Sequence, residues 1–478
     1  MQQKDKNITF GLALIPMLVM VVAMGVTIVK FEGSPHIPLI LGAIVSAFIA
    51  WRKGFSWRDI EQSAYKGIRL ALPAILIIIT VGITIGAWIG GGIVATMVYY
   101  GLKLISPSLF LVSISIICAI VTLAIGSSWS TMGTIGVAGM GIGASMGIPL
   151  PMVAGAIISG SYFGDKMSPL SDTTNLASGV VGADLFDHIR HMLYTTIPGF
   201  VISIIIYWFM GRKFTASSLN NENIANVMDT LQANFVISPL LLLVPAIVIV
   251  LVARRVPALP ALFIGVILGW ASHILVQGGA IGTAVNTLQG GYSITSGNEM
   301  VDTLFNRGGI DDMMYTVSLT IVAMTFGGIM EHTGMLKALV DQILKLARSA
   351  RSLVVTTIVS AFFTNVAAAE QYISVVLPGR MYAQAYHDKN LHPKNLSRAV
   401  EDGGTLTSPF VPWNTCGVYI YSTLGVSAFQ YAPYALVNFI VPILAIIFAT
   451  VGFKLAYMTD TEAAEWDKLL KEKENQAG

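Results

Sequence analysis

Charged side chains are scarce in this sequence. Asp, Glu, Lys and Arg make up 11% of the 478 residues, against about 25% in a soluble domain. Hydrophobic residues reach 54%, and the mean hydropathy is +0.72. A soluble chain could not cover so large an apolar core with so few charges. The composition therefore excludes an ordinary soluble protein and predicts an all-α polytopic membrane protein embedded in a lipid bilayer.

Other signals are missing as well. The sequence has two cysteines, Cys118 and Cys416, both in apolar surroundings, which favours packing residues over a disulfide or a metal pair. The net charge of +2 gives no indication of nucleic acid as a partner. No Walker motif, dinucleotide fingerprint, metalloprotease helix or catalytic triad is present. These absences argue against an enzyme, against a bound cofactor and against direct drive by ATP.

Apolar segments long enough to span a bilayer, about 20 residues each, follow one another along most of the chain. The clearest interruption is a polar linker at residues 212–234. It separates a first transmembrane repeat, residues 1–211, from a second one, residues 235–458. Residues 459–478 are expected to form a charged cytoplasmic tail.

The two halves resemble each other. Gly92 matches Gly334, and Ser-Pro-Leu at 168–170 matches Ser-Pro-Phe at 408–410, in the same order along both halves. An ordered series of this kind predicts an internal repeat.

Lys and Arg concentrate on the cytoplasmic side of membrane proteins. Residues 52–69 are rich in both, whereas the matching segment 277–311 has one arginine; conversely residues 337–351 are basic and their first-half counterpart has only Lys103. The excess reverses between matching segments. The sequence therefore predicts two inverted-topology repeats with both termini cytoplasmic. Broken helices and re-entrant-type hairpins would give about 10 crossings plus two hairpins, an architecture typical of secondary transporters.

Four polar interruptions lie inside apolar sequence, and they pair across the repeats. Residues 126–131 correspond to residues 362–371, where Glu370 lies within an apolar hairpin. Unwound backbone at membrane depth is tolerated only inside protein or beside a water-filled cavity. The alternative for this pair is helix packing through small residues and an interhelical hydrogen bond.

The interruption at residues 164–175 carries the strongest signal. Asp165 and Lys166 are expected to neutralise each other, which leaves Asp172 without an adjacent basic partner. Asp172 is flanked by Ser, Thr and Asn, whose oxygens suit a small cation, and ionisable groups at membrane depth are usually functional. The alternative is a surface loop in which Asp172 caps the next helix.

The fourth interruption, residues 401–415, contains two prolines that break a helix. Its Glu401 has an alternative explanation as the partner of nearby Arg398. Two histidines, His188 and His191, are expected at an interface or in a loop, in contact with solvent.

The candidate ion- or substrate-binding residues are the oxygen-bearing side chains of these interruptions: Asp172, Asp165, Ser128, Thr131, Thr173, Thr174, Asn175, Asn365, Glu370, Asp402, Thr405, Asn414 and Thr415. Those expected to ligate Na⁺ directly are Asp172, Ser128, Asn175 and Asn414. The secondary candidates for carrying protons are Asp165, Glu370 and Asp402.

The motifs at residues 126–131, 164–174 and 408–415 resemble the signatures of the NhaC family of sodium/proton antiporters. The resemblance extends over nearly the whole chain, including length and repeat layout. It implies an inverted-repeat fold with two hairpins and a homodimer in a bacterial inner membrane. It also implies transport of Na⁺ and H⁺, although the family includes exchangers that couple these ions to organic anions such as malate and lactate.

The leading hypothesis is therefore secondary active exchange of Na⁺ for H⁺ by alternating access. One alternative is an organic anion exchanger, in which half-helix N-termini hold the anion. Arg380 and Arg398 are expected to be loop charges, which weakly favours a cation as the only cargo. A second alternative is an ion channel, which an inverted repeat within one chain disfavours.

Overall fold

The computed structural model describes residues 7–31, 33–214, 221–254, 256–463 and 466, which form helices and short connections. The helices before the predicted linker are α1 (Phe10–Phe31), α2 (His36–Arg52), α3 (Trp57–Gly90), α4 (Ile93–Leu104), η1 (Pro107–Leu109), α5 (Phe110–Ile125), α6 (Ser128–Thr131), η2 (Met132–Gly136), α7 (Val137–Ser145), α8 (Leu150–Met167), α9 (Asp172–Val181) and α10 (Leu185–Gly211). The predicted all-α class is confirmed.

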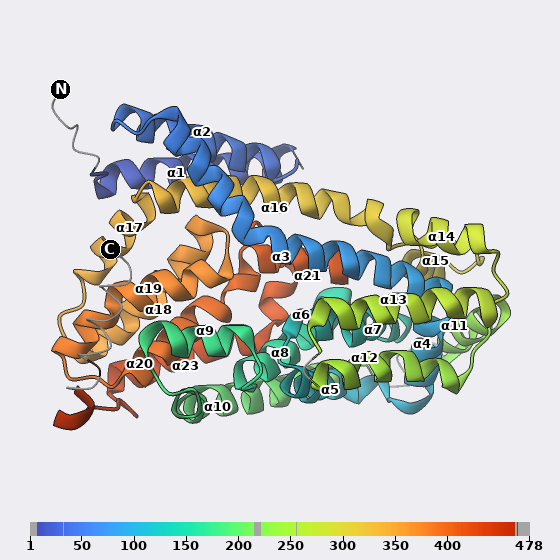
Figure 1. Cartoon of the computed structure of the whole chain (residues 1–478). Helices are drawn as coiled ribbons and strands as arrows, with labels where there is room; N and C mark the ends of the chain where they lie inside the picture. Colours follow the sequence, from blue (N-terminus) through green and yellow to red (C-terminus); the bar gives the residue numbers. More distant parts are fainter. Residues whose placement is uncertain (1–6, 32, 215–220, 255, 464–465, 467–478) are drawn as a thin grey trace.

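The remaining helices are α11 (Asn221–Asn234), η3 (Pro239–Leu242), α12 (Leu243–Ala253), α13 (Ala258–Leu275), α14 (Ile281–Gly290), α15 (Glu299–Phe305), α16 (Gly309–His332), α17 (Met335–Leu344), α18 (Ala350–Ala368), α19 (Gln371–Asp388), α20 (Pro393–Val400), η4 (Glu401–Thr405), η5 (Ser408–Phe410), α21 (Thr415–Leu424), α22 (Ala428–Tyr431), η6 (Ala432–Tyr434) and α23 (Leu436–Val451). In Figure 1, α17 to α20 lie at one end of the molecule and α11, α14 and α15 at the other.

Among the described residues, six helices are long and apolar enough to cross a membrane, or up to eight if each of two bent helix pairs counts as one span. Shorter apolar helices, such as 36–52 and 93–104, accompany them. Many large apolar side chains on these helices are exposed, as expected where lipid covers the surface. The chain is therefore a multi-pass helical membrane protein.

The long helix α3 packs along α16, and Figure 1 shows the two running beside each other through much of the molecule. Glycines make this approach possible. A Cβ on Gly67 would overlap the backbone of α16, and one on Gly328 would lie 2.7 Å from the Cα of Gly67. Close backbone contact through glycine is typical of membrane helices, where dispersion and weak polar contacts hold the packing.

A similar contact fixes α8 against α5. A Cβ on Gly160 would overlap the carbonyl oxygen of Ser115, and a Cβ on Gly164 would overlap that of Ala119. The next residue on α8 is Asp165, so the tight α5–α8 packing places it in the protein interior, where the residue is only 6% exposed.

Left-handed glycines cap helices in both halves of the chain. Gly92 and Gly334, the N-caps of α4 and α17, have φ values of 72° and 82°. Gly182 and Gly425, the C-caps of α9 and α21, have φ values of 79° and 74°. Glycine adopts this conformation without a steric penalty, which explains its use at all four sites.

Helix α11 lies within residues 212–234, the stretch predicted to be a linker. Its Val227 and Leu231 are buried against the core. Residues 215–220 of that stretch, and residues 464–465 and 467–478 of the predicted tail, lie outside the described residues.

Candidate functional site

Two helix breaks meet in the middle of the molecule. At the first, α5 ends at Gly126, which has a φ of 77°, and Ser127 caps the new helix α6 by accepting a hydrogen bond from the Ser130 amide at 3.2 Å. Only glycine fits at position 126, because a Cβ there would lie 2.7 Å from the backbone of Leu170. The break thus exposes the N-terminus of α6 inside the protein.

The second break has the same construction. Helix α18 ends at Ala369, which is left-handed at a φ of 59°, and Glu370 is the N-cap of α19. One carboxylate oxygen of Glu370 accepts a hydrogen bond from the Ile373 amide at 3.1 Å, and the other accepts one from the Thr415 hydroxyl at 3.4 Å. Both breaks correspond to interruptions predicted from the sequence.

Asp165, which is 37 residues away in sequence, also bonds to the start of helix α6. Its Oδ2 accepts hydrogen bonds from the Ser128 amide at 3.2 Å and from the Ser128 hydroxyl at 2.6 Å. The hydroxyl of Thr174 in turn contacts the backbone oxygens of Asp165 and Lys166, at 3.4 and 3.2 Å. Each broken helix therefore begins at a buried carboxylate of the chain itself, which suits the partial positive charge of a helix N-terminus.

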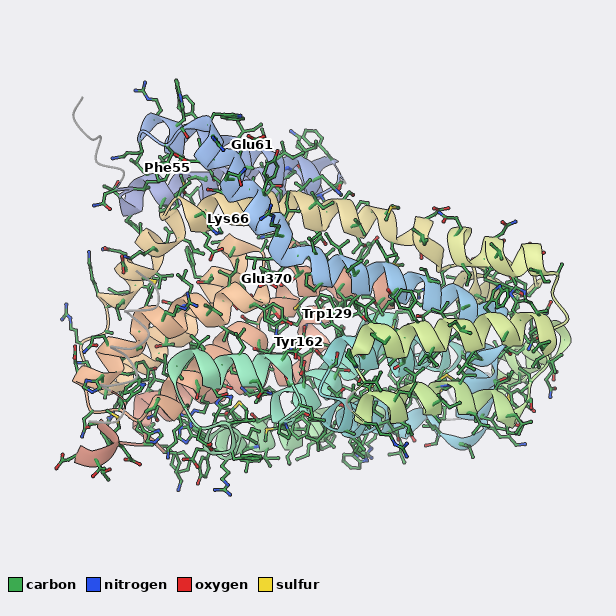
Figure 2. The ribbon with its side chains drawn as sticks, in the orientation of Figure 1. Phe55, Glu61, Lys66, Trp129, Tyr162 and Glu370 are labelled. Atoms are coloured by element: carbon green, nitrogen blue, oxygen red, sulfur yellow. The ribbon has the colours of Figure 1, made fainter. Side chains whose placement is uncertain are left out.

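A cavity of about 480 Å³ lies between the two breaks. Its polar wall consists of three carboxylates, two serines, a threonine and a glutamine: Asp165, Asp172, Glu370, Ser127, Ser128, Thr173 and Gln371. Trp129 and Tyr372 add aromatic surface. Trp129 and Glu370, both labelled in Figure 2, lie near the middle of the molecule's long axis.

Asp172 lies at the start of a helix and at the edge of the cavity. It is the first residue of α9, directly after the N-cap Ser171, so it lies where an acidic side chain favours the helix. It also lines the cavity, and it is more exposed than the buried Asp165.

Behind the cavity lies a layer of buried charged and polar side chains. Lys166 forms a salt bridge with Asp402, and both side chains are fully buried. The hydroxyl of Thr195 donates to the other oxygen of Asp402 at 3.3 Å. The expected pairing of Lys166 with Asp165 is therefore wrong: Asp165 bonds to Ser128, and the lysine bonds across to the second half of the chain.

Glu401 also departs from expectation. Its carboxylate lies 3.4 Å from His188 and accepts a hydrogen bond from Thr173 at 3.2 Å, so its partner is not Arg398. His188 is fully buried and His191 is 5% exposed, which corrects the expectation that both are solvated. Arg398 is fully buried too, rather than a loop charge.

A cluster of amides joins the second-half interruptions. The Asn365 amide donates to the Gly404 carbonyl at 2.6 Å and to the Thr407 hydroxyl at 3.1 Å. The Asn414 amide donates to the side-chain oxygen of Asn365 at 3.0 Å, while its own oxygen caps α21 through the Cys416 amide at 3.0 Å. These two asparagines are thus engaged in holding the unwound segments together.

The structure divides the predicted site residues into three groups. The cavity brings together Ser128, Asp165, Asp172, Thr173 and Glu370. Thr174 and Thr415 adjoin this group through hydrogen bonds to Asp165 and Glu370, and Asp402 lies in the layer behind it. The others lie elsewhere: Thr131 bonds to Thr122 and Ser127, Asn175 bonds to the carbonyls of Pro169 and Ser171, Thr405 is buried in η4, and Asn365 and Asn414 bond to each other.

Several residues of the site were missed from the sequence. Ser127, Trp129, Gln371 and Tyr372 line the cavity. Ser127, Trp129 and Gln371 lie inside predicted interruptions, and Tyr372 directly follows one, so proximity to the breaks was the available signal. The stacking of Trp129 on Tyr419, with ring centroids 4.2 Å apart, had no sequence signal, because the two rings come from different halves.

Comparisons with known proteins identify the family of the chain. The Na⁺/H⁺ antiporter family model matches residues 160–453. The Na⁺/H⁺ antiporter NhaC of Alkalihalophilus pseudofirmus is 40% identical over 451 residues, covering 94% of this chain and 97% of the relative. The malate-2H⁺/Na⁺-lactate antiporter of Bacillus subtilis is 39% identical over 446 residues, covering 92% and 95%. The arginine/ornithine antiporter ArcD of Halobacterium salinarum is 34% identical over 461 residues, covering 96% and 95%. The chain belongs to the Na⁺/H⁺ antiporter family.

Proposed function

We propose that this protein exchanges Na⁺ for H⁺ across a membrane by alternating access. The observation that carries the proposal is the cavity itself, in which Asp165, Asp172 and Glu370 face one volume between two broken helices. The antiporters to which the chain is similar support the same reaction.

The chemistry follows from the lining. Na⁺ prefers oxygen ligands, and the carboxylates, together with the hydroxyls of Ser127, Ser128 and Thr173, supply them. A carboxylate that binds either Na⁺ or a proton cannot hold both at full strength, so the two cations compete. Competition at one site exposed to alternate sides produces antiport.

We further propose that the fold is a pair of inverted repeats, with about ten crossings plus two hairpins. The left-handed caps at matching positions and the two breaks of the same construction support a repeat. The reversal of basic residues between matching segments supports opposite orientations. On this proposal both termini are cytoplasmic, in a bacterial inner membrane, and the protein forms a homodimer.

The alternative of an organic anion exchanger finds less support in the cavity. The malate-2H⁺/Na⁺-lactate antiporter is a relative of this chain, and a carboxylate substrate would need positive charge or free helix N-termini. Asp165 and Glu370 already cap the two broken helices. The anion-binding elements are therefore occupied by the chain's own carboxylates.

Purified protein in proteoliposomes with an acidic lumen and an internal pH dye tests the proposal. External Na⁺ is expected to raise the lumenal pH in the wild type and not in Asp165→Asn or Glu370→Gln. The matched control is Asp229→Asn, an exposed carboxylate on α11. A wild-type protein that moves labelled malate or lactate, but no protons in response to Na⁺ alone, would refute the proposal in favour of the anion exchanger.

The role of Asp172 is tested separately in the same vesicles. If Asp172→Asn exchanges Na⁺ for H⁺ at the wild-type rate, Asp172 is a helix-terminus residue and the ion site is confined to the other carboxylates.

A further inference from the structure

The cavity between the two breaks has two unlike walls. One is polar and carries Asp165, Asp172 and Glu370. The other is aliphatic and comes from α3, from α12 and from Val256 beyond it: Leu70, Pro73, Ala74, Ile77, Val252 and Val256. A bare or hydrated metal ion gains nothing from an aliphatic surface, so Na⁺ alone does not account for this wall.

The size of the cavity leads to the same conclusion. A Na⁺ ion with about six waters of about 30 Å³ each occupies roughly 180 Å³. The cavity has about 480 Å³, which falls within the range of about 300–1,000 Å³ typical of small-molecule sites. There is room for an organic group beside the carboxylates.

The charge of the expected ligand follows from the residues that line the cavity. Among the described residues that line this cavity, three are carboxylates and none is Lys, Arg or His. The NH groups that begin α6 and α19 donate to Asp165 and Glu370, so they offer little to an anionic ligand. Trp129 and Tyr372 add aromatic rings, whose faces attract organic cations.

We propose that this cavity also binds a small organic cation, with an ammonium or guanidinium head at the carboxylates and an aliphatic tail along α3 and α12, in competition with Na⁺. The inference rests on the proposed function, because it places the head at the carboxylates that would bind Na⁺. Each half of such a ligand meets a wall that matches it.

Alkyltrimethylammonium ions from methyl to hexyl are suitable probes, because a quaternary ammonium carries no proton and does not itself collapse a pH gradient. Binding to the purified protein is measured by calorimetry at several Na⁺ concentrations. The apparent Kd is expected to rise linearly with the Na⁺ concentration, and affinity is expected to increase up to about fourfold for each added methylene that reaches the aliphatic wall. Alkylsulfonates of equal length serve as the anionic control and are expected not to compete with Na⁺.

Variants of the aliphatic wall and of a second apolar groove test where the alkyl tail binds. Ala74→Phe fills the aliphatic wall of the cavity and is expected to lower the ratio of hexyl to methyl affinity. The matched control is Ala47→Phe, on a separate apolar groove of about 740 Å³ between α2, α3 and α16 that also contains Glu61. This variant is expected to keep the wild-type ratio. If Ala74→Phe does not fold, Ile77→Ala shortens the same wall and lowers the same ratio.

The outcomes separate this inference from the proposed function. Three results would overturn the inference while leaving Na⁺/H⁺ exchange intact. They are an affinity that does not depend on tail length, competition of the sulfonates with Na⁺, and a ratio of hexyl to methyl affinity that falls in Ala47→Phe rather than in Ala74→Phe. A protein that binds the alkylammonium ions by these criteria, but shows no Na⁺-dependent proton movement in vesicles, would retain the inference and refute the proposed function.

Discussion

Replacing Lys166 with methionine removes one member of a buried ion pair and nearly preserves the volume of the side chain. Lys166 and Asp402 are both fully buried, on α8 and in the π-helix η4, so their salt bridge joins the two halves of the protein. Removing one partner of a buried pair costs about 3–5 kcal/mol, because a charge is left in an apolar interior without its counter-charge. Lys166→Met is therefore expected to lower the free energy of unfolding substantially.

The surroundings of the pair determine which single substitution costs more. Arg398 is also fully buried and interacts electrostatically with Asp402, and Thr195 donates a hydrogen bond to the same carboxylate. After Lys166→Met, Asp402 still faces Arg398, so the loss is expected at the lower end, about 3 kcal/mol. After Asp402→Asn, two buried cations lose their counter-charge, so the loss is expected at about 5 kcal/mol or more.

Equilibrium unfolding in mixed micelles, followed by circular dichroism, measures these differences. The double variant is expected to be less destabilised than the sum of the single variants, because it removes both members of the pair. Lys103→Met, an exposed lysine at the end of α4, is the control and is expected to remain within about 0.5 kcal/mol of wild type. If the two single effects add to within about 0.5 kcal/mol, the residues do not act as a pair and the reasoning is refuted.

Three smaller predictions use the same unfolding measurement. Gly160→Ala is expected to destabilise by about 1–3 kcal/mol or more, because its Cβ meets the α5 backbone, whereas Gly25→Ala has open space and is expected to be neutral or stabilising; equal effects would contradict the packing argument. Asn365→Ala leaves buried polar groups without partners and is expected to cost about 1–3 kcal/mol, so a neutral result would mean that the amide cluster adds no stability. Tyr419→Phe removes a 2.6 Å hydrogen bond to the Trp129 carbonyl and is expected to cost about 1 kcal/mol, while the stacked rings keep the tryptophan emission unchanged; a shifted emission would show that the hydroxyl positions the indole.

The helices and their interruptions could be predicted because both are local properties of the sequence. Long apolar runs predict membrane helices, and a polar stretch with glycine or proline predicts a break, as found at Gly126 and after η4. The break at Ala369 is harder to locate, because a left-handed alanine has no signature of its own. It is held by contacts from elsewhere, including the hydrogen bond from the Thr415 amide to its carbonyl at 3.0 Å.

The pairing of charges could not be predicted, for a geometric reason. Asp165 and Lys166 are neighbours in sequence, but successive residues of a helix point about 100° apart and do not face each other. On α8 the carboxylate therefore points to the first break and the ammonium to Asp402, 236 positions away.

The case of Glu401 is different. It lies three residues after Arg398, which on a regular helix would bring the two side chains to one face. The helix is regular up to Glu401, whose amide bonds to the Ser397 carbonyl, yet the carboxylate contacts His188 and Thr173 from neighbouring elements instead.

The same carboxylates serve both the fold and the proposed exchange, and this has a consequence for transport. Asp165 and Glu370 accept hydrogen bonds from the amides that begin α6 and α19. An ionised carboxylate is a strong acceptor for such amides, and protonation weakens it, as does sharing its oxygens with a cation. A typical N-cap contributes about 1 kcal/mol to its helix. The occupant of the cavity and the ends of the broken helices thus compete for the same oxygens, so an exchange of Na⁺ for H⁺ necessarily changes how firmly these helix ends are held. A binding site built on helix caps is coupled to backbone conformation by its construction, and alternating access requires a coupling of this kind.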